Sequence, residues 1–422
     1  MKDYVFPQGF MWGAATASHQ IEGHNFNSDW YAWELKGKIK DESSSHPGCN
    51  SEQNFSRDID LVKNLNLNSY RFSIEWAKIQ PSEDKFDEDV LNNYLILIKG
   101  LVKNNIDPMV TLFHFSLPLW FAQKGGFEKE ENIKYFLDFI EKFLQIVGDL
   151  VQFYIVINEP MVYVYQSYIT GEWPPGEKNM EKSMIVARNL LRAYDKAYNI
   201  IKTYNNGAKV SIAKHTAVYI PNRKLSIFDN FTKKKVEKYF DHAFIDSIIN
   251  NRYEKPFGKN EQADFSSDFD FIGINYYTKR YISYSKGNYI FNDEKNEQKT
   301  DIGWYFYPEG IYDVLKRFKR YDRPLIITEN GIADKEDRTR NLYIIKTINK
   351  IYEAMKDGIN VAGYMHWSLM DNFEWVEGQK MCFGLYETHY SNLYFTLRSS
   401  GNVYSRIVYD NALNERFLTF IK

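Results

Sequence analysis

Short apolar runs alternate with longer amphipathic segments along the chain. Between the runs, apolar residues recur at helical spacing, as Phe136, Phe139, Ile140, Phe143 and Leu144 do. The runs are rich in β-branched and aromatic residues and have the length of strands: 10–17, 69–75, 109–115, 153–158, 210–216, 270–275, 325–329 and 361–367. Strands that alternate with helices predict a parallel sheet of the α/β class, and eight of them predict a closed (β/α)8 TIM barrel.

Nothing in the sequence divides this pattern into separate units. No Pro-, Gly- or Ser-rich linker interrupts it, and no repeat period of about 20–50 residues stands out. A chain of 422 residues can bury a large core without disulfides or metals. We therefore expect a single barrel domain over residues 1–422.

Several predicted strands end in a polar or ionisable residue. The C-terminal ends of barrel strands converge on one rim, where the active sites of such barrels lie. Six strand ends carry such groups: Glu75, His114, Asn158 followed by Glu159, Asn275, Glu329, and His366 before Trp367. Packing alone does not explain six polar strand ends, so the pattern predicts a site at this rim.

Two of these residues have the chemistry needed to break a glycosidic bond. The reaction needs one protonated carboxyl for the leaving oxygen and one ionised carboxylate for the cationic sugar centre. Glu159 precedes Pro160 and Glu329 precedes Asn330-Gly331, so each follows a buried strand that then ends. A single glutamate there could equally cap the next helix. Two of them, with the other polar strand ends, favour catalysis.

The fourth and seventh strands face each other across an eight-stranded barrel. Residues at their ends can approach within about 5–5.5 Å, the carboxyl separation of a retaining enzyme. At that distance the two charges repel, so one carboxyl is held protonated while the other needs donors to stay ionised. Arg71, near the end of the second strand, and Tyr277, just after the sixth, are suitable donors.

Composition excludes some classes of protein. Aromatic residues make up 17% of the chain; their rings pack against sugars but also fill cores. The net charge is −2 and the longest basic run, at 233–235, is explained by a solvated helix face, so we expect no nucleic-acid partner. The eight histidines are scattered and no metal-binding, GxGxxG or Walker motif follows a strand, so we expect no metal and no cofactor.

The cysteines and the apolar segments bear on location. Cys49 and Cys382 show no metal-site spacing, so we expect reduced thiols and a cytoplasmic protein. The segment at 10–17 follows Pro7 and Gly9 and lacks the apolar run of a signal peptide. No apolar window is long enough to predict a transmembrane segment. The oligomeric state is left open.

At these residues the sequence closely resembles glycoside hydrolase family 1, the β-glucosidase and β-galactosidase family. The resemblance implies a (β/α)8 barrel and a retaining β-glycosidase that hydrolyses terminal β-linked hexosides, as small glycosides or oligosaccharides, through a covalent glycosyl-enzyme. The matching segments keep the family's order: MWGAATASHQIEG at 11–23, YRFSIEW at 70–76, FHF at 113–115, INEP at 157–160, GINYYT at 273–278, ITENGI at 327–332, HWSLMDNFEW at 366–375 and FGL at 383–385.

The resemblance also implies a role for each matching residue. Glu329 would be the nucleophile and Glu159 the acid/base. Asn158 would hold the sugar 2-hydroxyl. The nucleophile would be oriented by Arg71, Asn275 and Tyr277, and the rest of the sugar would be bound by Gln20, His114, Trp367, Glu374, Trp375 and Phe383.

The residues around Glu374 favour a role in sugar binding even when the family resemblance is set aside. Glu374 follows a strand-like run beside Asp371 and Asn372, a polar cluster that a plain loop would not require. Its carboxylate can accept hydrogen bonds from two adjacent hydroxyls but would repel a 6-phosphate, which argues against a phospho-glycosidase. His366 is expected to pack, because the adjacent Trp367 carries the family's role.

Two alternatives share these residues. A transglycosidase of the same family would use the same covalent intermediate, and the sequence does not separate it from a hydrolase. A catalytically inactive sugar-binding barrel would usually lack one of the two glutamates, and both are present. The sequence departs from the family at Phe115, where Trp is common, and this changes the contacts expected at the sugar 3-hydroxyl.

Overall fold

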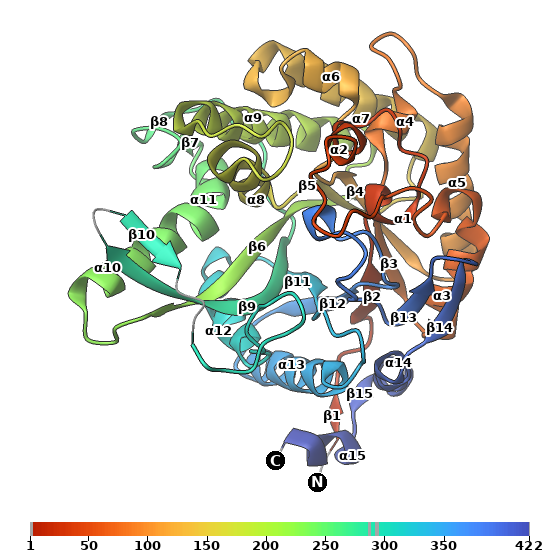
Figure 1. Cartoon of the computed structure of the whole chain (residues 1–422), viewed down its shortest axis with the longest axis vertical. Coiled ribbons are helices and arrows are strands. Elements are labelled where there is room, and N and C mark those ends of the chain that lie inside the picture. Colours follow the sequence, from red (N-terminus) through yellow and green to blue (C-terminus); the bar gives the residue numbers. More distant parts are fainter. Residues whose placement is uncertain (1–2, 286–287, 292–294, 422) are drawn as a thin grey trace.

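The computed structural model describes residues 3–285, 288–291 and 295–421. Eight parallel strands form a barrel, which closes where the sixth strand pairs with the fifth (Figure 1). In chain order the strands are β2 (Met11–Ala15), β3 (Ser69–Ser73), β4 (Asp107–Phe113), β5 (Phe153–Asn158), β6 (Lys209–Pro221), β9 (Ile272–Ser285), β11 (Leu325–Asn330) and β12 (Val361–Trp367). The predicted (β/α)8 barrel and all eight strands are confirmed.

Each barrel strand is followed by a helix that covers the outside of the barrel. The predicted apolar face of one of them is confirmed, since Phe136, Phe139, Ile140, Phe143 and Leu144 are all buried. Strands enclosed in this way are buried on both faces, and every residue of β2, β3 and β11 is buried. The helices are α3 (Phe55–Asn64), α5 (Glu88–Lys103), α7 (Ile133–Val147), α9 (Met180–Tyr204), α11 (Ala243–Ile249), α12 (Gly310–Phe318), α13 (Arg340–Lys356) and α14 (Ser399–Asp410).

Two strands run well beyond the barrel. The predicted runs at 210–216 and 270–275 extend to Pro221 and Ser285, because β6 and β9 pair past the rim as far as Pro221 and Ile282 and the end of β9 pairs with β10. Strand β10 (Asn288–Phe291) adds to the outer edge of β9 in antiparallel register. One consequence is that Tyr277 lies inside β9 rather than just after it.

The two ends of the described chain meet away from the rim. Strand β1 (Tyr4–Val5) pairs with β15 (Ala412–Leu413), and Figure 1 shows both termini together at one end of the molecule. Cys49 and Cys382 are buried and free, as expected. Within the described ranges, no helix has the length and apolar character needed to cross a membrane.

Candidate active site

Glu329, in β11, is held by two donors of different kinds. Arg71 Nη1 donates to Glu329 Oε1 at 2.7 Å, and the Tyr277 hydroxyl donates to Oε2 at 2.6 Å. Arg71 comes from β3 and is fully buried, so the carboxylate is the counter-ion of a cation inside the barrel. Directly after the strand only glycine fits at 331, because a Cβ there would lie 1.9 Å from the Trp367 carbonyl oxygen.

Glu159 turns the chain from β5 into helix α8 (Pro160–Tyr165). Its backbone lies in the left-handed region with φ of 44°, which costs a residue other than glycine about 1–3 kcal/mol. It occupies the N-cap position, yet its side chain makes no capping hydrogen bond. The carboxylate instead accepts from Asn275 Nδ2 at 2.8 Å and lies 3.4 Å from His215 Nδ1. Helix capping therefore does not explain this glutamate.

Asn158 and Asn275 join the two glutamates into one network. Asn158 Oδ1 accepts from Arg71 Nη2 at 2.7 Å and from Asn275 Nδ2 at 3.2 Å. The same Asn275 nitrogen donates to Glu159, while Arg71 also binds Glu329. Asn158 therefore lies between the two glutamates: Arg71 links it to Glu329, and Asn275 links it to Glu159.

The two carboxyl groups titrate as an interacting pair. Burial raises the pKa of Glu329 to about 7 against the opposing charge of Arg71, and the Glu159 charge adds to the rise. Burial acts in the same direction on Glu159, but the His215 ring outweighs it with the help of weaker partners, so the pKa of Glu159 lies below its ordinary value. These directions are the reverse of those required by a protonated Glu159 and an ionised Glu329.

Gln20 and Glu374 lie side by side although they come from opposite ends of the chain. Gln20, in the short helix α1 (Ser18–Ile21), donates through Nε2 to the Phe373 carbonyl oxygen at 2.8 Å and to Glu374 Oε2 at 3.3 Å. Gln20 Oε1 is buried and has no hydrogen-bond partner among the described residues. Burial raises the pKa of Glu374 to about 8, and the Glu329 charge adds to the rise. The pair offers acceptors for neighbouring hydroxyl groups.

His114 offers a donor next to these acceptors. Its Nε2 accepts from Asn158 Nδ2 at 3.1 Å, so the proton of the neutral ring is on Nδ1. Nδ1 is buried and meets no acceptor within the described part of the chain. Burial, with a smaller contribution from the Arg71 charge, holds the pKa of His114 well below its ordinary value, so the ring stays neutral.

Aromatic rings line the same site. The rings of Trp367 and Trp375 stack with His114, at centroid distances of 5.9 and 6.0 Å. The ring of Phe383 packs edge-on against Tyr277, at 6.1 Å between centroids. The structure therefore brings together all twelve residues to which the resemblance gives a role in the site. Phe115, the departure from the family pattern, contacts the ring of Trp375.

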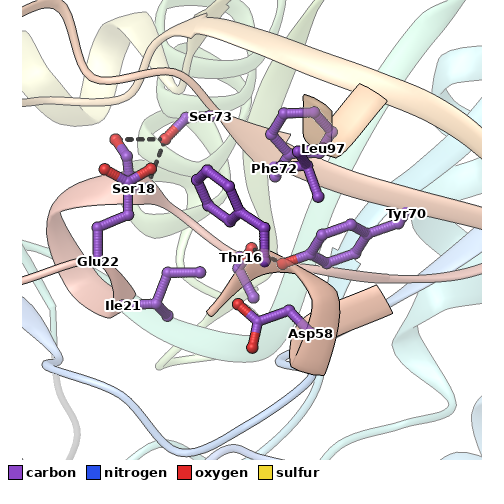
Figure 2. Close-up of a pocket in the computed structure, with 10 residues that line it drawn as sticks. Thr16, Ser18, Ile21, Glu22, Asp58, Tyr70, Phe72, Ser73 and Leu97 are labelled. Atoms are coloured by element: carbon purple, nitrogen blue, oxygen red, sulfur yellow. Dashed lines mark hydrogen bonds between the residues drawn. The ribbon is translucent and has the colours of Figure 1, made fainter. Parts of the chain in front are cut away.

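Glu75, one of the six polar strand ends, does not reach the site. Strand β3 ends at Ser73, and Glu75 instead accepts from the backbone N–H of Ala77, at 3.3 Å, at the start of helix α4 (Trp76–Ile79). It also accepts from the hydroxyl of Ser18 at 2.9 Å. Ser18 and Ser73 border a small cavity outside the barrel, under helices α3 and α5 (Figure 2). The prediction that Glu75 points into the site is wrong.

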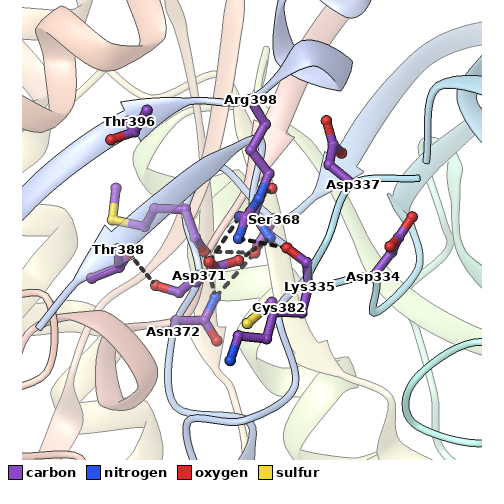
Figure 3. A network of polar contacts seen from close by, with 12 residues as sticks. Asp334, Lys335, Asp337, Ser368, Asp371, Asn372, Cys382, Thr388, Thr396 and Arg398 are labelled. Atoms are coloured by element: carbon purple, nitrogen blue, oxygen red, sulfur yellow. Dashed lines mark hydrogen bonds and ion pairs between the residues drawn. The ribbon is translucent and has the colours of Figure 1, made fainter. Parts of the chain in front are cut away.

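The polar cluster beside Glu374 supports its loop. Asp371 forms an ion pair with Arg398 at 2.7 Å and accepts from the backbone N–H of Gly384 at 2.8 Å, as Figure 3 shows for the first of these contacts. Asn372 Oδ1 accepts from Gln20 Nε2 at 3.0 Å. Asp371 therefore holds the backbone of the loop that carries Glu374, and the side-chain amide of Asn372 holds Gln20.

His366 packs, as expected. It is fully buried beside Tyr364 and Tyr404, with ring centroids 6.5 and 6.0 Å away. Burial lowers the pKa of His366 to about 3, so the ring is neutral. Its neighbour Trp367 is the residue that faces His114.

Sequence reasoning missed three residues of the site. His215, near the end of the barrel part of β6, contacts Glu159. Trp173 and Trp304 pack against Trp375 and Tyr277, at 5.8 and 5.2 Å between ring centroids. His215 carried a signal similar to that of the other polar strand ends, since it lies with Lys214 at the end of the predicted strand 210–216. The two tryptophans lie in loops whose course no local pattern predicts.

Comparisons with known proteins agree with this geometry. The sequence model described as Glycosyl hydrolase family 1 matches residues 2–413. Beta-glucosidase A of Acetivibrio thermocellus is 30% identical over 97% of this chain and 100% of its own length. A beta-glycosidase from Pyrococcus horikoshii is 38% identical, with a TM-score of 0.93 over 99% of this chain and 98% of that one. A beta-glucosidase from Thermotoga maritima in complex with glucoimidazole is 29% identical, with a TM-score of 0.92 over 97% and 100% of the two chains.

Proposed function

The chain belongs to glycosyl hydrolase family 1 and is a retaining β-glycosidase, and from that premise we propose which residues carry out the reaction. Glu329 attacks the anomeric carbon while Glu159 protonates the leaving glycosidic oxygen. Glu159, now a carboxylate, then takes a proton from the water that displaces Glu329. Two inversions at the same carbon release the sugar with its β configuration retained.

The unequal surroundings of the two glutamates support this assignment. Glu329 is bound by a permanent cation, Arg71, at 2.7 Å and by a hydroxyl at 2.6 Å, as a group that must attack while ionised requires. Glu159 has one neutral amide donor and a histidine that is charged only when protonated. The residue beside the permanent cation is the better candidate for the nucleophile.

The position of the shared proton depends on His215. With a protonated His215 ring the Glu159 carboxylate is stabilised, in line with its lowered pKa. With a neutral ring, the ion pair with Arg71 at 2.7 Å favours the ionised form of Glu329. The proton then lies on Glu159, and this is the form that we propose to be active.

We propose that the sugar is a neutral β-linked hexose. Asn158 lies between the two glutamates and suits the 2-hydroxyl, while His114 Nδ1 and Gln20 Oε1 supply a free donor and a free acceptor for other hydroxyls. An ionised Glu374 carboxylate can accept from two adjacent hydroxyls. The tryptophan rings provide apolar faces for the sugar ring, with Trp367 beneath it and Trp375 alongside, and Phe383 lies near its C6.

We also propose a domain organisation and a cellular location. Residues 1–422 form a single catalytic domain, which the pairing of β1 with β15 supports. The two buried, free cysteines are typical of a reducing compartment, so we propose a cytoplasmic enzyme.

Covalent trapping tests the roles of the glutamates. A dinitrophenyl 2-deoxy-2-fluoro-β-glucoside should form the glycosyl-enzyme readily, because its leaving group needs no proton, and should release it slowly, because fluorine destabilises the cationic transition state. Mass spectrometry of the digested protein should find the sugar on Glu329. A label on Glu159 or Glu374 would refute the assignment.

A panel of nitrophenyl glycosides tests the sugar class. Activity is expected on neutral β-hexosides, such as the glucoside, galactoside and fucoside, and none on the β-glucoside 6-phosphate. The reason is that an ionised Glu374 carboxylate beside the sugar would repel a phosphate. Preference for the 6-phosphate would show that this carboxyl does not bind the glycone.

A further inference from the structure

The paired ends of β6 and β9 carry a projection at the active-site end of the barrel. Both strands pass the site, where β6 contributes His215 and β9 contributes Tyr277, and stay paired as far as Pro221 and Ile282. Pro221 lies six positions after His215, which in extended chain is about 20 Å. Helix α10 (Ile227–Val236) follows β6 and lies at the periphery of the molecule (Figure 1).

The tip of this projection exposes large apolar side chains. Leu225 is 95% exposed, Ile227 82%, Phe228 67% and Phe231 65%, and these are among the most exposed large hydrophobic residues of the described chain. Tyr284, at the end of β9, stacks on Phe228 with ring centroids 5.8 Å apart and is itself 40% exposed. Large apolar side chains gathered on a protein surface indicate an interaction site. We call these five residues the apolar tip.

Lysines surround the apolar tip. The segment from residue 222 to 238 has a net charge of +4, whereas the whole chain has −2. Its two acidic residues, Asp229 and Glu237, are already bound to arginine side chains. No ion pair is found, among the residues that the structure describes, for the exposed side chains that we call the basic collar: Lys224, Lys234, Lys235 and Lys238.

Helix geometry places members of both groups on one face. At 100° per residue, Ile227, Phe231 and Lys234 fall within a narrow stripe of helix α10, and it is the stripe that faces away from the barrel. The opposite side, with Asp229, Thr232 and Val236, is buried against the projection. The exposed stripe is therefore apolar at its start and basic at its end.

We propose that this projection docks onto the anionic surface of a lipid bilayer. The apolar tip would enter the boundary between headgroups and acyl chains, where exposed aromatic and aliphatic side chains are stabilised. The basic collar would stay at headgroup level and bind negative charge, with each lysine worth about a fivefold gain in binding. A protein partner or a second copy of the chain would be expected to match an apolar surface without requiring four unpaired lysines around it.

Co-sedimentation with vesicles tests this proposal on the intact enzyme. The protein should sediment with vesicles of phosphatidylcholine and phosphatidylglycerol, much less with phosphatidylcholine alone, and less as salt is raised. Phe228→Ser with Phe231→Ser should weaken binding by about 100-fold or more, because each ring loses its apolar burial. Lys234→Gln with Lys235→Gln should weaken it by about 25-fold.

A matched variant controls for general surface effects. Leu35→Ser with Ile96→Ser removes side chains that are 73% and 64% exposed elsewhere on the molecule and should leave vesicle binding unchanged. Hydrolysis of a nitrophenyl β-glucoside in solution should be the same for all variants, which shows that they are folded. Absence of binding to the anionic vesicles, or equal losses in the control, would overturn the proposal. So would a dimer that dissociates on loss of the two phenylalanines.

Discussion

Replacing His215 with Asn should shift the pH dependence of the reaction. In the parent enzyme, kcat/KM should be bell-shaped, with an acid limb from ionisation of Glu329 and an alkaline limb from loss of the Glu159 proton. The His215 ring lowers the pKa of Glu159 against the effect of burial. Without the ring, Glu159 should keep its proton to higher pH, so the alkaline limb should move upward.

The contact sets the size of this shift. In the form with a protonated ring, the unit charges at His215 Nδ1 and Glu159 Oε1 lie 3.4 Å apart and interact by about 5 kcal/mol at an effective dielectric constant of about 20 and by about 1 kcal/mol in bulk water. The two side chains are 23% and 9% exposed, so the interaction lies between these limits. One pKa unit corresponds to about 1.4 kcal/mol, and we therefore expect an upward shift of about one unit or more.

The assay is the pH profile of kcat/KM with a nitrophenyl β-glucoside for the parent and the variant. His389→Asn serves as the control, because His389 lies on the hairpin strand β13 (Tyr386–His389) and contacts Thr396 instead of either glutamate. The control should leave both limbs in place. If the alkaline limb of His215→Asn is unchanged or moves to lower pH, this histidine does not lower the pKa of the acid/base Glu159.

Two further changes test the surroundings of the site. Tyr277→Phe removes the 2.6 Å donor to Glu329; a hydrogen bond to a charged group is worth about 1.5–3 kcal/mol, so kcat/KM should fall roughly 10- to 150-fold, and an unchanged value would contradict the contact. Glu374→Gln removes a carboxyl whose pKa is raised from 4.5 to about 8, so that the folded enzyme keeps a proton that the unfolded chain releases. The parent therefore loses stability as pH rises through this range, and calorimetry should show the variant gaining in relative melting temperature from pH 5 to pH 8 while its kcat/KM falls.

The barrel could be predicted from sequence because its strands are buried on both faces. Continuous apolar runs such as Phe153–Asn158 follow directly from that burial. The extended ends of β6 and β9 could not be predicted, because their pairing with each other and with β10 makes them strands. That pairing depends on residues far apart in the chain, and no local pattern records it.

The site was predicted where a residue's direction followed from its strand. Glu75 and His114 carry the same local signal, a polar residue after an apolar run, yet only His114 reaches the site. The difference arises because β3 ends at Ser73 and the chain turns into a helix before Glu75. His215 was not predicted, although it too is a polar residue at the end of a predicted strand. The opposite pKa shifts of Glu159 and Glu329 depend on neighbours from several strands, which the sequence does not place.

Azide rescue of the two alanine variants tests the central claim most directly. Glu159→Ala keeps the nucleophile, so it should form the glycosyl-enzyme from a dinitrophenyl β-glucoside, and azide, which needs no deprotonation, should displace Glu329 to give β-glucosyl azide. Glu329→Ala cannot form that intermediate, so it should lose on the order of 10⁴-fold in rate, and azide should attack the substrate directly to give the α-azide. The anomer of each product is read by proton NMR. The α-azide from Glu159→Ala and the β-azide from Glu329→Ala would show that the roles of the two glutamates are reversed.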